Sequence, residues 1–303
     1  PLASFFSFIK SYLRSSSYQE NGYDRSNLEE HLHLHADFCN TYLMLPGSSV
    51  FQLLHNSDSA TGSPEGGYYT NFNSSPFESM ASISGTASVV ERMSGMAEEE
   101  DNDRERLDSF LARLQGTSGD MCFVINTHGR EREINVSSTP QTSEYERWYV
   151  EDFITIDVEV IVDTLWQRSL NNRESETILF VLACHSADYS AHFLDLWEQN
   201  NQNLEEENRI PPPTIVSASD FGALANSGCT YAYQCLARDV QAGRVELPIT
   251  GEMFLRYVDV YNFVVYPRAE IMFIDQIDQT DPGFFYRGRI ISQGEPNNSE
   301  ELT

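Results

Sequence analysis

The chain has 303 residues, of which 46 are acidic and 19 basic, so its formal net charge at pH 7 is −27. This charge disfavours a nucleic-acid partner, because phosphate backbones are bound by clusters of lysine and arginine. It favours attraction to basic peptides. No apolar run reaches the length of a membrane span, and we expect no membrane partner. The length and the 40% content of hydrophobic residues suit one enlarged α/β domain or two small ones.

Alternating histidines occur in the N-terminal extension, which we expect to cover residues 1–47. His31, His33 and His35 are followed in the same period by Asp37. On a strand these four side chains would share one face, and three imidazoles with a carboxylate can bind zinc. An exposed strand face or an adventitious metal site is the preferred explanation of the pattern, and no glutamate-bearing zinc-hydrolase motif accompanies it. We therefore assign no metal, and we keep a metal-binding protein as an alternative function.

The main domain is expected over residues 48–280 and begins with a weak candidate strand at 49–55. Residues 56–102 are rich in serine, glycine and threonine and end in an acidic run, which predicts a long mobile insertion. An amphipathic helix is predicted over residues 103–115, because Leu107, Phe110, Leu111 and Leu114 recur at helical spacing.

Two apolar runs then end in reactive side chains. Residues 121–127 predict a buried strand that is followed directly by His128 and Gly129. Residues 178–183 predict a second buried strand that is followed directly by Cys184. Between them we expect a polar stretch to residue 146 and a helix with Thr155 as its N-cap and Asp157 in its first turn. Since chemistry in open α/β sheets gathers beyond the carboxyl ends of the strands, the two ends predict a thiol and an imidazole at one sheet edge.

The C-terminal half continues the alternation of helices and strands. Helices are predicted over residues 191–199, 230–241 and 251–260, and strands over 214–218 and 269–275. An acidic linker covers 200–210, and residues 281–303 form a tail whose end we expect to be disordered. The five cysteines include no Cys-x-x-Cys pair, so apart from Cys184 they indicate reduced thiols in a reducing compartment.

A thiol and an imidazole in this arrangement suit nucleophilic catalysis. The imidazole of His128 can deprotonate Cys184 and later donate a proton to the leaving amine. The backbone N–H groups of Gly129 and Cys184 can bind an oxyanion, and a glycine lets the backbone approach a substrate closely. A tyrosine-phosphatase activity is excluded, because no arginine lies within six residues after Cys184.

The His-Gly and Ala-Cys strand ends resemble those of the caspase-like cysteine peptidases of clan CD, which include caspases, metacaspases, legumains and clostripain-type enzymes. The separation of 56 residues between His128 and Cys184 is similar to the roughly 50 residues typical of caspases. Cys184-His185-Ser186 resembles the metacaspase motif. The chain departs from that motif at Leu182, where metacaspases carry aspartate, and at Ala187, where glycine is usual. The resemblance covers roughly residues 48–276.

This resemblance implies a caspase-like α/β fold, with a mainly parallel central sheet and helices on both faces. It implies a cysteine endopeptidase with a His128–Cys184 dyad, an oxyanion hole at Gly129 and Cys184, and no cofactor. By the same resemblance Ser217, Ser219 and Asp220 line the S1 pocket, and residues 56–102 or 200–210 are candidate maturation sites. An Asp220 carboxylate that points into the pocket, or Asp188 in its place, would favour a basic P1 residue. If Asp220 points away, the small polar pocket would favour a small or neutral P1 residue. The alternative is a catalytically silent caspase-like scaffold that binds a partner protein. The expected location is the cytoplasm, or a host cytosol for an injected effector.

Overall fold

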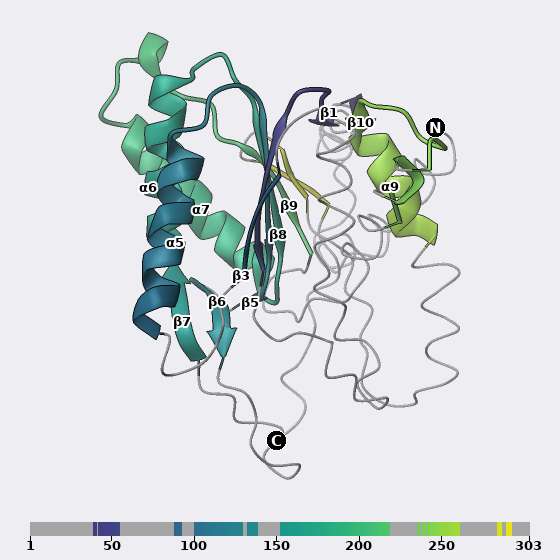
Figure 1. The fold of residues 1–303 in the computed structure, drawn as a ribbon. Helices are drawn as coiled ribbons and strands as arrows, with labels where there is room; N and C mark the ends of the chain where they lie inside the picture. The colour runs from purple at the N-terminus through teal and green to yellow at the C-terminus, as the bar shows by residue number, and fades with distance from the viewer. Residues whose placement is uncertain are drawn as a thin grey trace, which may run out of the picture.

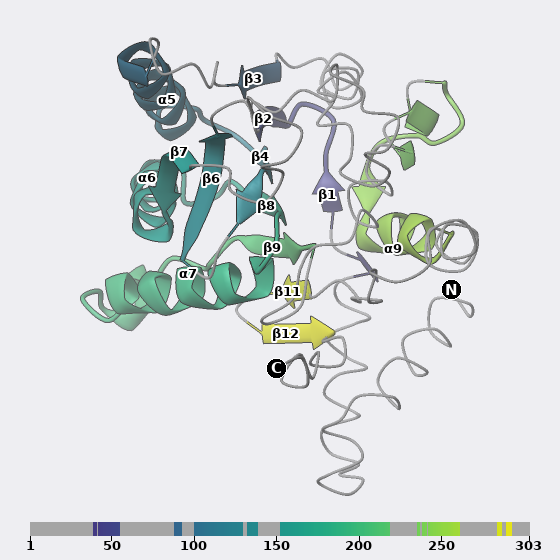
Figure 2. The ribbon, with the colours of Figure 1, turned by 90° about the horizontal axis from the view of Figure 1, so that it is seen from below.

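The computed structural model describes residues 39–40, 42–54, 88–92, 100–129, 132–138, 152–218, 235–236, 238–240, 242–260, 284–286 and 289–292. Its main feature is a seven-stranded sheet in the order β12-β11-β9-β8-β4-β2-β3, visible edge-on in Figure 2. Five neighbouring strands are parallel: β2 (Ser49–Leu54), β3 (Ser88–Arg92), β4 (Met121–Asn126), β8 (Thr177–Leu182) and β9 (Thr214–Ser217). The antiparallel strands β11 (Phe284–Tyr286) and β12 (Arg289–Ser292) extend the sheet beyond β9.

Helices cover both faces of this sheet (Figure 1). One face packs against α5 (Glu100–Gln115), α6 (Val158–Asn171) and α7 (Ser186–Asn201), and the other lies beneath α9 (Gly251–Val260). The expectation of an α/β protein with a mainly parallel central sheet flanked by helices is therefore confirmed. Among the described helices, none is both long and apolar enough to cross a membrane.

Strands β4 and β8 lie in the middle of the sheet because they are apolar along their whole length. Every residue of both strands is buried. Phe123 and Ile125 face the α5–α7 layer, whereas Cys122 and Val124 face α9. A central strand that is covered on both faces requires such a continuous run. The predicted strands at 49–55, 121–127, 178–183 and 214–218 correspond to β2, β4, β8 and β9, within one residue at each end.

The segment before α6 differs from the prediction. Residues 152–157 form strand β7 (Asp152–Asp157), so Thr155 is not an N-cap, and α6 begins at Val158 with Asp157 as its N-cap. Ile154 and Ile156 are buried while Thr155 is exposed, which is the two-residue period of a half-buried strand. The expected polar stretch contains strand β6 (Glu133–Ser138), which pairs with β7 and with the two-residue strand β5 (His128–Gly129).

Other boundaries also differ from the prediction. The predicted mobile insertion at 56–102 contains strand β3 and the start of α5. The predicted N-terminal extension contributes β1 (Tyr42–Met44), which pairs with β10 (Ile249–Thr250), and the predicted tail contributes β11 and β12. Helix α7 begins at Ser186 rather than at 191, because Tyr189, Phe193 and Trp197 form one buried stripe. The predicted strand at 269–275 and the end of the tail lie outside the described residues.

Arg168 is buried near the amino ends of β4 and β8. Its Nη1 donates to Thr177 Oγ1 at 2.7 Å, and its Nη2 donates to the carbonyl oxygen of Gly119. Burial lowers the pKa of Arg168, and the nearby Asp120 carboxylate opposes that shift. The side chain therefore joins α6 to the loop that precedes β4.

We expect Arg168→Ala to lower the free energy of unfolding by about 2 kcal/mol, because the buried Thr177 hydroxyl and the Gly119 carbonyl lose their donor. Arg168→Met restores apolar volume without the hydrogen bonds, and it should recover less than half of the loss. Urea unfolding of the three proteins measures both effects. If Arg168→Ala were as stable as the wild type, or if Arg168→Met recovered the full loss, the Arg168 hydrogen bonds would not be what stabilises the fold here.

Candidate active site

The predicted histidine and cysteine leave the sheet from the same edge. Strands β4 and β8 are parallel neighbours, and Asn126 lies opposite Leu182 in their last shared row. His128 and Cys184 each follow two residues after this row. The prediction that the two strands are parallel neighbours is confirmed. The small sheet β5-β6-β7 lies at this edge, at the bottom of the main sheet in Figure 1.

Gly129 lies directly against the backbone of Cys184. A Cβ atom at position 129 would come within 2.9 Å of the Ala183 Cβ, and it would come closer still to the carbonyl oxygen of Cys184. Real Cβ atoms do not make such contacts, so this site admits only glycine without displacement of the backbone. The sequence predicts a glycine that lets the backbone approach a substrate. In the structure, the group that it approaches is the turn carrying the thiol.

The His128–Gly129 segment is also held from its other side. His128 pairs with Asn135, and Gly129 pairs with Ile134 of β6. Ile134 is fully buried in the core beneath α5–α7, which anchors the small sheet. The structure describes the backbone of His128 and not its imidazole. An imidazole–sulfur distance of about 3–7 Å therefore stays a prediction.

Cys184 lies in a sharp turn between β8 and α7. Ala183 is buried and Cys184 is partly exposed, so the thiol is not sealed in the core. His185 adopts a left-handed conformation with φ 54° and ψ 26°, and α7 begins at the next residue. This conformation is uncommon for a residue other than glycine, and such strained residues cluster at functional sites. The turn holds Cys184 next to the positive end of a 16-residue helix.

His185 and Asp188 lie close together in the turn that follows Cys184. The Nδ1 atom of His185 lies 3.6 Å from Asp188 Oδ2, and both side chains are about one quarter exposed, at 27% and 24%. The carbonyl oxygen of His185 accepts a hydrogen bond of 3.0 Å from the N–H of Tyr189. His185 has no predicted role of its own. Its signals in the sequence are its place in the Cys184-His185-Ser186 motif and its position between the cysteine and the helix.

Ser217 lies beneath the first turn of α7. Its Oγ is 2.7 Å from Ser190 Oγ and 3.3 Å from the carbonyl oxygen of Ser186, and Ser190 Oγ donates to that same carbonyl at 2.7 Å. All three residues are fully buried. The described geometry thus makes Ser217 part of the support of the α7 turn, and its assignment to an S1 pocket stays a prediction. Ser219 and Asp220 lie outside the described residues.

The other described thiols have different environments. Cys122 is fully buried in β4. Burial, together with the neighbouring Glu252 carboxylate, raises the pKa of Cys39 to about 11. Both effects disfavour the thiolate, which is the reactive form of cysteine. The environment of Cys39 therefore suppresses its nucleophilicity near neutral pH.

We expect Cys39 to react slowly with iodoacetamide at pH 7, because a thiol with a pKa of about 11 is ionised to only about one part in 10⁴ at that pH. Raising the pH should increase its alkylation rate about tenfold per unit up to pH 10. Mass spectrometry of the Cys39 peptide across a pH series measures this rate, with glutathione as the solution reference. A rate that levels off below pH 9 would contradict the raised pKa.

The described residues give no support to metal binding. Among them, no group of three or more histidine, cysteine, aspartate or glutamate side chains is placed to hold a metal ion. The cluster of His31, His33, His35 and Asp37 lies outside the described part of the chain.

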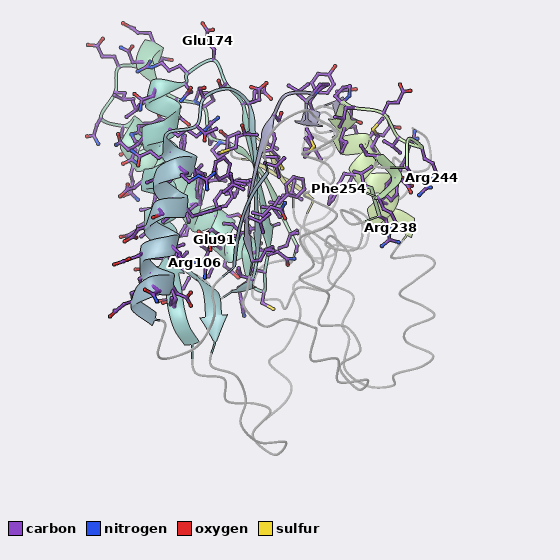
Figure 3. All side chains as sticks on the ribbon, viewed as in Figure 1. Glu91, Arg106, Glu174, Arg238, Arg244 and Phe254 are labelled. Atoms are coloured by element: carbon purple, nitrogen blue, oxygen red, sulfur yellow. The ribbon has the colours of Figure 1, made fainter. Side chains whose placement is uncertain are left out.

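A groove lies elsewhere, between the edge strand β3 and α5. Its lining includes Glu91, Glu105, Arg106 and Arg113, with Phe110 at its base. Arg106 Nη2 and Glu91 Oε1 are 2.5 Å apart, and Figure 3 shows the two side chains meeting between helix and strand. Strand β2 separates this groove from β4, so it is not part of the candidate active site.

Comparison with known proteins does not assign this chain to a family. No protein-family model matches the chain, and no curated protein matches it. Among solved structures, it is similar to protein GSU0716 from Geobacter sulfurreducens, with 13% identity, coverage of 82% of this chain and 95% of that chain, and a TM-score of 0.35. It is also similar to Raptor from Chaetomium thermophilum, with 13% identity, coverage of 80% of this chain and 23% of that chain, and a TM-score of 0.32. Likenesses this low carry no argument about function.

Proposed function

We propose that this protein is a caspase-like cysteine endopeptidase in which Cys184 is the nucleophile and His128 the general acid and base. One observation carries the proposal. Strands β4 and β8 end in the same row, and Gly129 lies against the peptide of Cys184 at the edge where both strands end. A thiol and a histidine brought to one sheet edge by unrelated parts of the chain are the parts that thiol-dependent acyl transfer needs.

The proposed reaction has two stages. In the first, the Cys184 thiolate attacks the scissile carbonyl carbon, and the electron pair moves to the carbonyl oxygen, which the N–H groups of Gly129 and Cys184 stabilise. The tetrahedral species collapses, the C–N bond breaks, and His128 donates a proton to the leaving amine. In the second, water attacks the thioester while His128 accepts its proton. The acid product leaves and the thiol is restored, so no cofactor enters the balance.

Three features of the Cys184 turn support this proposal. The thiol is partly exposed, whereas Cys122 on the neighbouring strand is buried. The left-handed His185 places the cysteine immediately before α7, and a helix amino end stabilises a thiolate. The hydroxyls of Ser190 and Ser217 bind the Ser186 carbonyl, which fixes the start of that helix.

Substrate choice follows from the same proposal. An Asp220 carboxylate in the S1 pocket would favour lysine or arginine at P1, and Ser219 would add a polar wall. The net charge of −27 also draws basic peptides toward the molecule. If Asp220 does line that pocket, the substrates are proteins or peptides with a basic P1 residue.

A peptidyl chloromethyl ketone tests the proposed nucleophile, because it alkylates an active thiol that it reaches as a substrate. We expect labelling at Cys184, mapped by mass spectrometry, with Cys235 as the internal control for simple exposure. Labelling should disappear in His128→Ala and persist in His192→Ala, a variant of a partly exposed histidine on α7. A folded protein that takes up no label and cleaves no peptide would instead be the caspase-like scaffold.

A further inference from the structure

One buried polar side chain near the candidate dyad has no role in the proposed chemistry. Asn126 is the last residue of β4 and is 2% exposed. Its Nδ2 atom is buried and makes no hydrogen bond in the structure. A buried donor without a partner is rare in native proteins and costs stability, so it needs a physical reason.

The position of Asn126 relates this donor to the active-site edge. In the last row of the sheet it lies between Leu54 of β2 and Leu182 of β8. Leu182 packs into the cluster on the α9 face, as do Cys122 and Val124 of β4, and strand alternation places Asn126 on that face too. His128 follows two residues after Asn126, and Cys184 two residues after Leu182. Asn126 is therefore one polar group between two leucines, directly below the proposed dyad.

The chemistry of this row selects the group that it would bind. The amide nitrogen is a donor, so the ligand must offer an acceptor, and lysine and arginine side chains have none. A carboxylate is an acceptor, but burying it between two leucines in a protein of charge −27 is unfavourable. A neutral carboxamide meets both conditions.

The depth of the row sets the length of the ligand. His128 follows Asn126 after a bend at Thr127, so their Cα atoms are at most about 7 Å apart. A P1 side chain that starts at the level of the dyad must extend below it to reach the amide. Of the two carboxamide side chains, glutamine is longer than asparagine by one methylene, and it therefore suits this distance better.

We propose that Asn126 is a specificity residue of the proposed peptidase, donating a hydrogen bond from Nδ2 to the side-chain carbonyl of a glutamine at P1. This inference rests on the proposed function. It competes with the basic P1 residue that Asp220 would favour, so the two assignments predict opposite substrate profiles.

The test uses three peptidyl chloromethyl ketones that share P2 to P4 and carry glutamine, leucine or lysine at P1. Wild-type protein should be labelled at Cys184 about tenfold faster by the glutamine probe than by the leucine probe. Asn126→Leu should lose this preference and accept leucine at least as well. The control Asn203→Leu, an exposed position beyond the far end of α7, should keep the wild-type profile.

Thermal unfolding of the unliganded variants gives a second readout. Since Asn126→Leu removes a buried donor without a partner, it should raise Tm by about 2 °C or more while abolishing the preference. A lower Tm would mean that Asn126 has a structural partner, and it would overturn the proposal. A lysine preference in wild type, or an unchanged preference in Asn126→Leu, would overturn it as well. Absence of Cys184 labelling by all three probes would instead refute the peptidase function, and this inference with it.

Discussion

Peptidase turnover should fall at least about 10³-fold in Cys184→Ala and by a similar factor in His128→Ala. Without the thiol no thioester forms, and without the imidazole the leaving amine receives no proton. Because the two residues act on the same steps, the double variant should be little slower than either single variant. This shared loss separates a dyad from two independent contributions, which would multiply.

The measurement is hydrolysis of a fluorogenic peptide selected from a library, with circular dichroism and Tm as tests of folding. Cys235→Ala and His192→Ala are matched controls, since both change partly exposed residues of the same type. They should keep kcat/KM within a factor of about three, as expected for surface changes. Turnover by Cys184→Ala at the wild-type rate on its correct substrate would end the assignment of the nucleophile.

The central strands could be predicted because their signal is local. The runs that become β4 and β8 are apolar throughout, and only a strand covered on both faces requires that pattern. The reactive residues after them follow in sequence, so their common sheet edge could be predicted from the usual parallel arrangement of α/β strands. The register that aligns Asn126 with Leu182 could not, because it depends on packing between segments 56 residues apart.

The small sheet β5-β6-β7 at the active-site edge could not be predicted, because its signal is not local. Strand β6 carries polar residues such as Glu133 and Asn135 and is stabilised by pairing with β7, which follows it after residues 139–151. The alternation of Ile154 and Ile156 with Thr155 was available as a signal, but a threonine followed by an acidic residue also resembles a helix start. Tertiary pairing decided between the two patterns.

The face of the sheet on which the Ser217 side chain lies could be predicted from its position in β9. It lies two residues after Ile215, which belongs to the core beneath α5–α7, so alternation predicts that Ser217 faces α7. The contact with Ser190 agrees with that direction. The approach of Gly129 to Cys184 had no such local signal, because it joins a loop after one strand to a turn after another.

Gly129→Ala should destabilise the protein at the upper end of the roughly 1–3 kcal/mol range of overpacking substitutions, and it should slow labelling of Cys184 about 10²-fold. The added methyl group would lie 2.9 Å from the Ala183 Cβ and closer to the Cys184 carbonyl oxygen. To relieve this contact, either the backbone of Gly129 or the backbone of Cys184 must move. The backbone of Gly129 is held in place because β5 pairs with β6 at Ile134. The turn carrying the thiol therefore has to move away from the histidine.

Gly116→Ala is the matched control for this expectation. Its added Cβ would lie 3.4 Å from the Ala112 carbonyl oxygen, an ordinary contact at the end of α5, and we expect little change in stability or labelling. Urea unfolding and the chloromethyl ketone labelling rate should be measured on both variants. If Gly129→Ala were as stable as Gly116→Ala, the close contact would be wrong. If it were destabilised but labelled at the wild-type rate, the contact would serve the fold alone, because displacing a catalytic thiol by about 1 Å must slow its reaction.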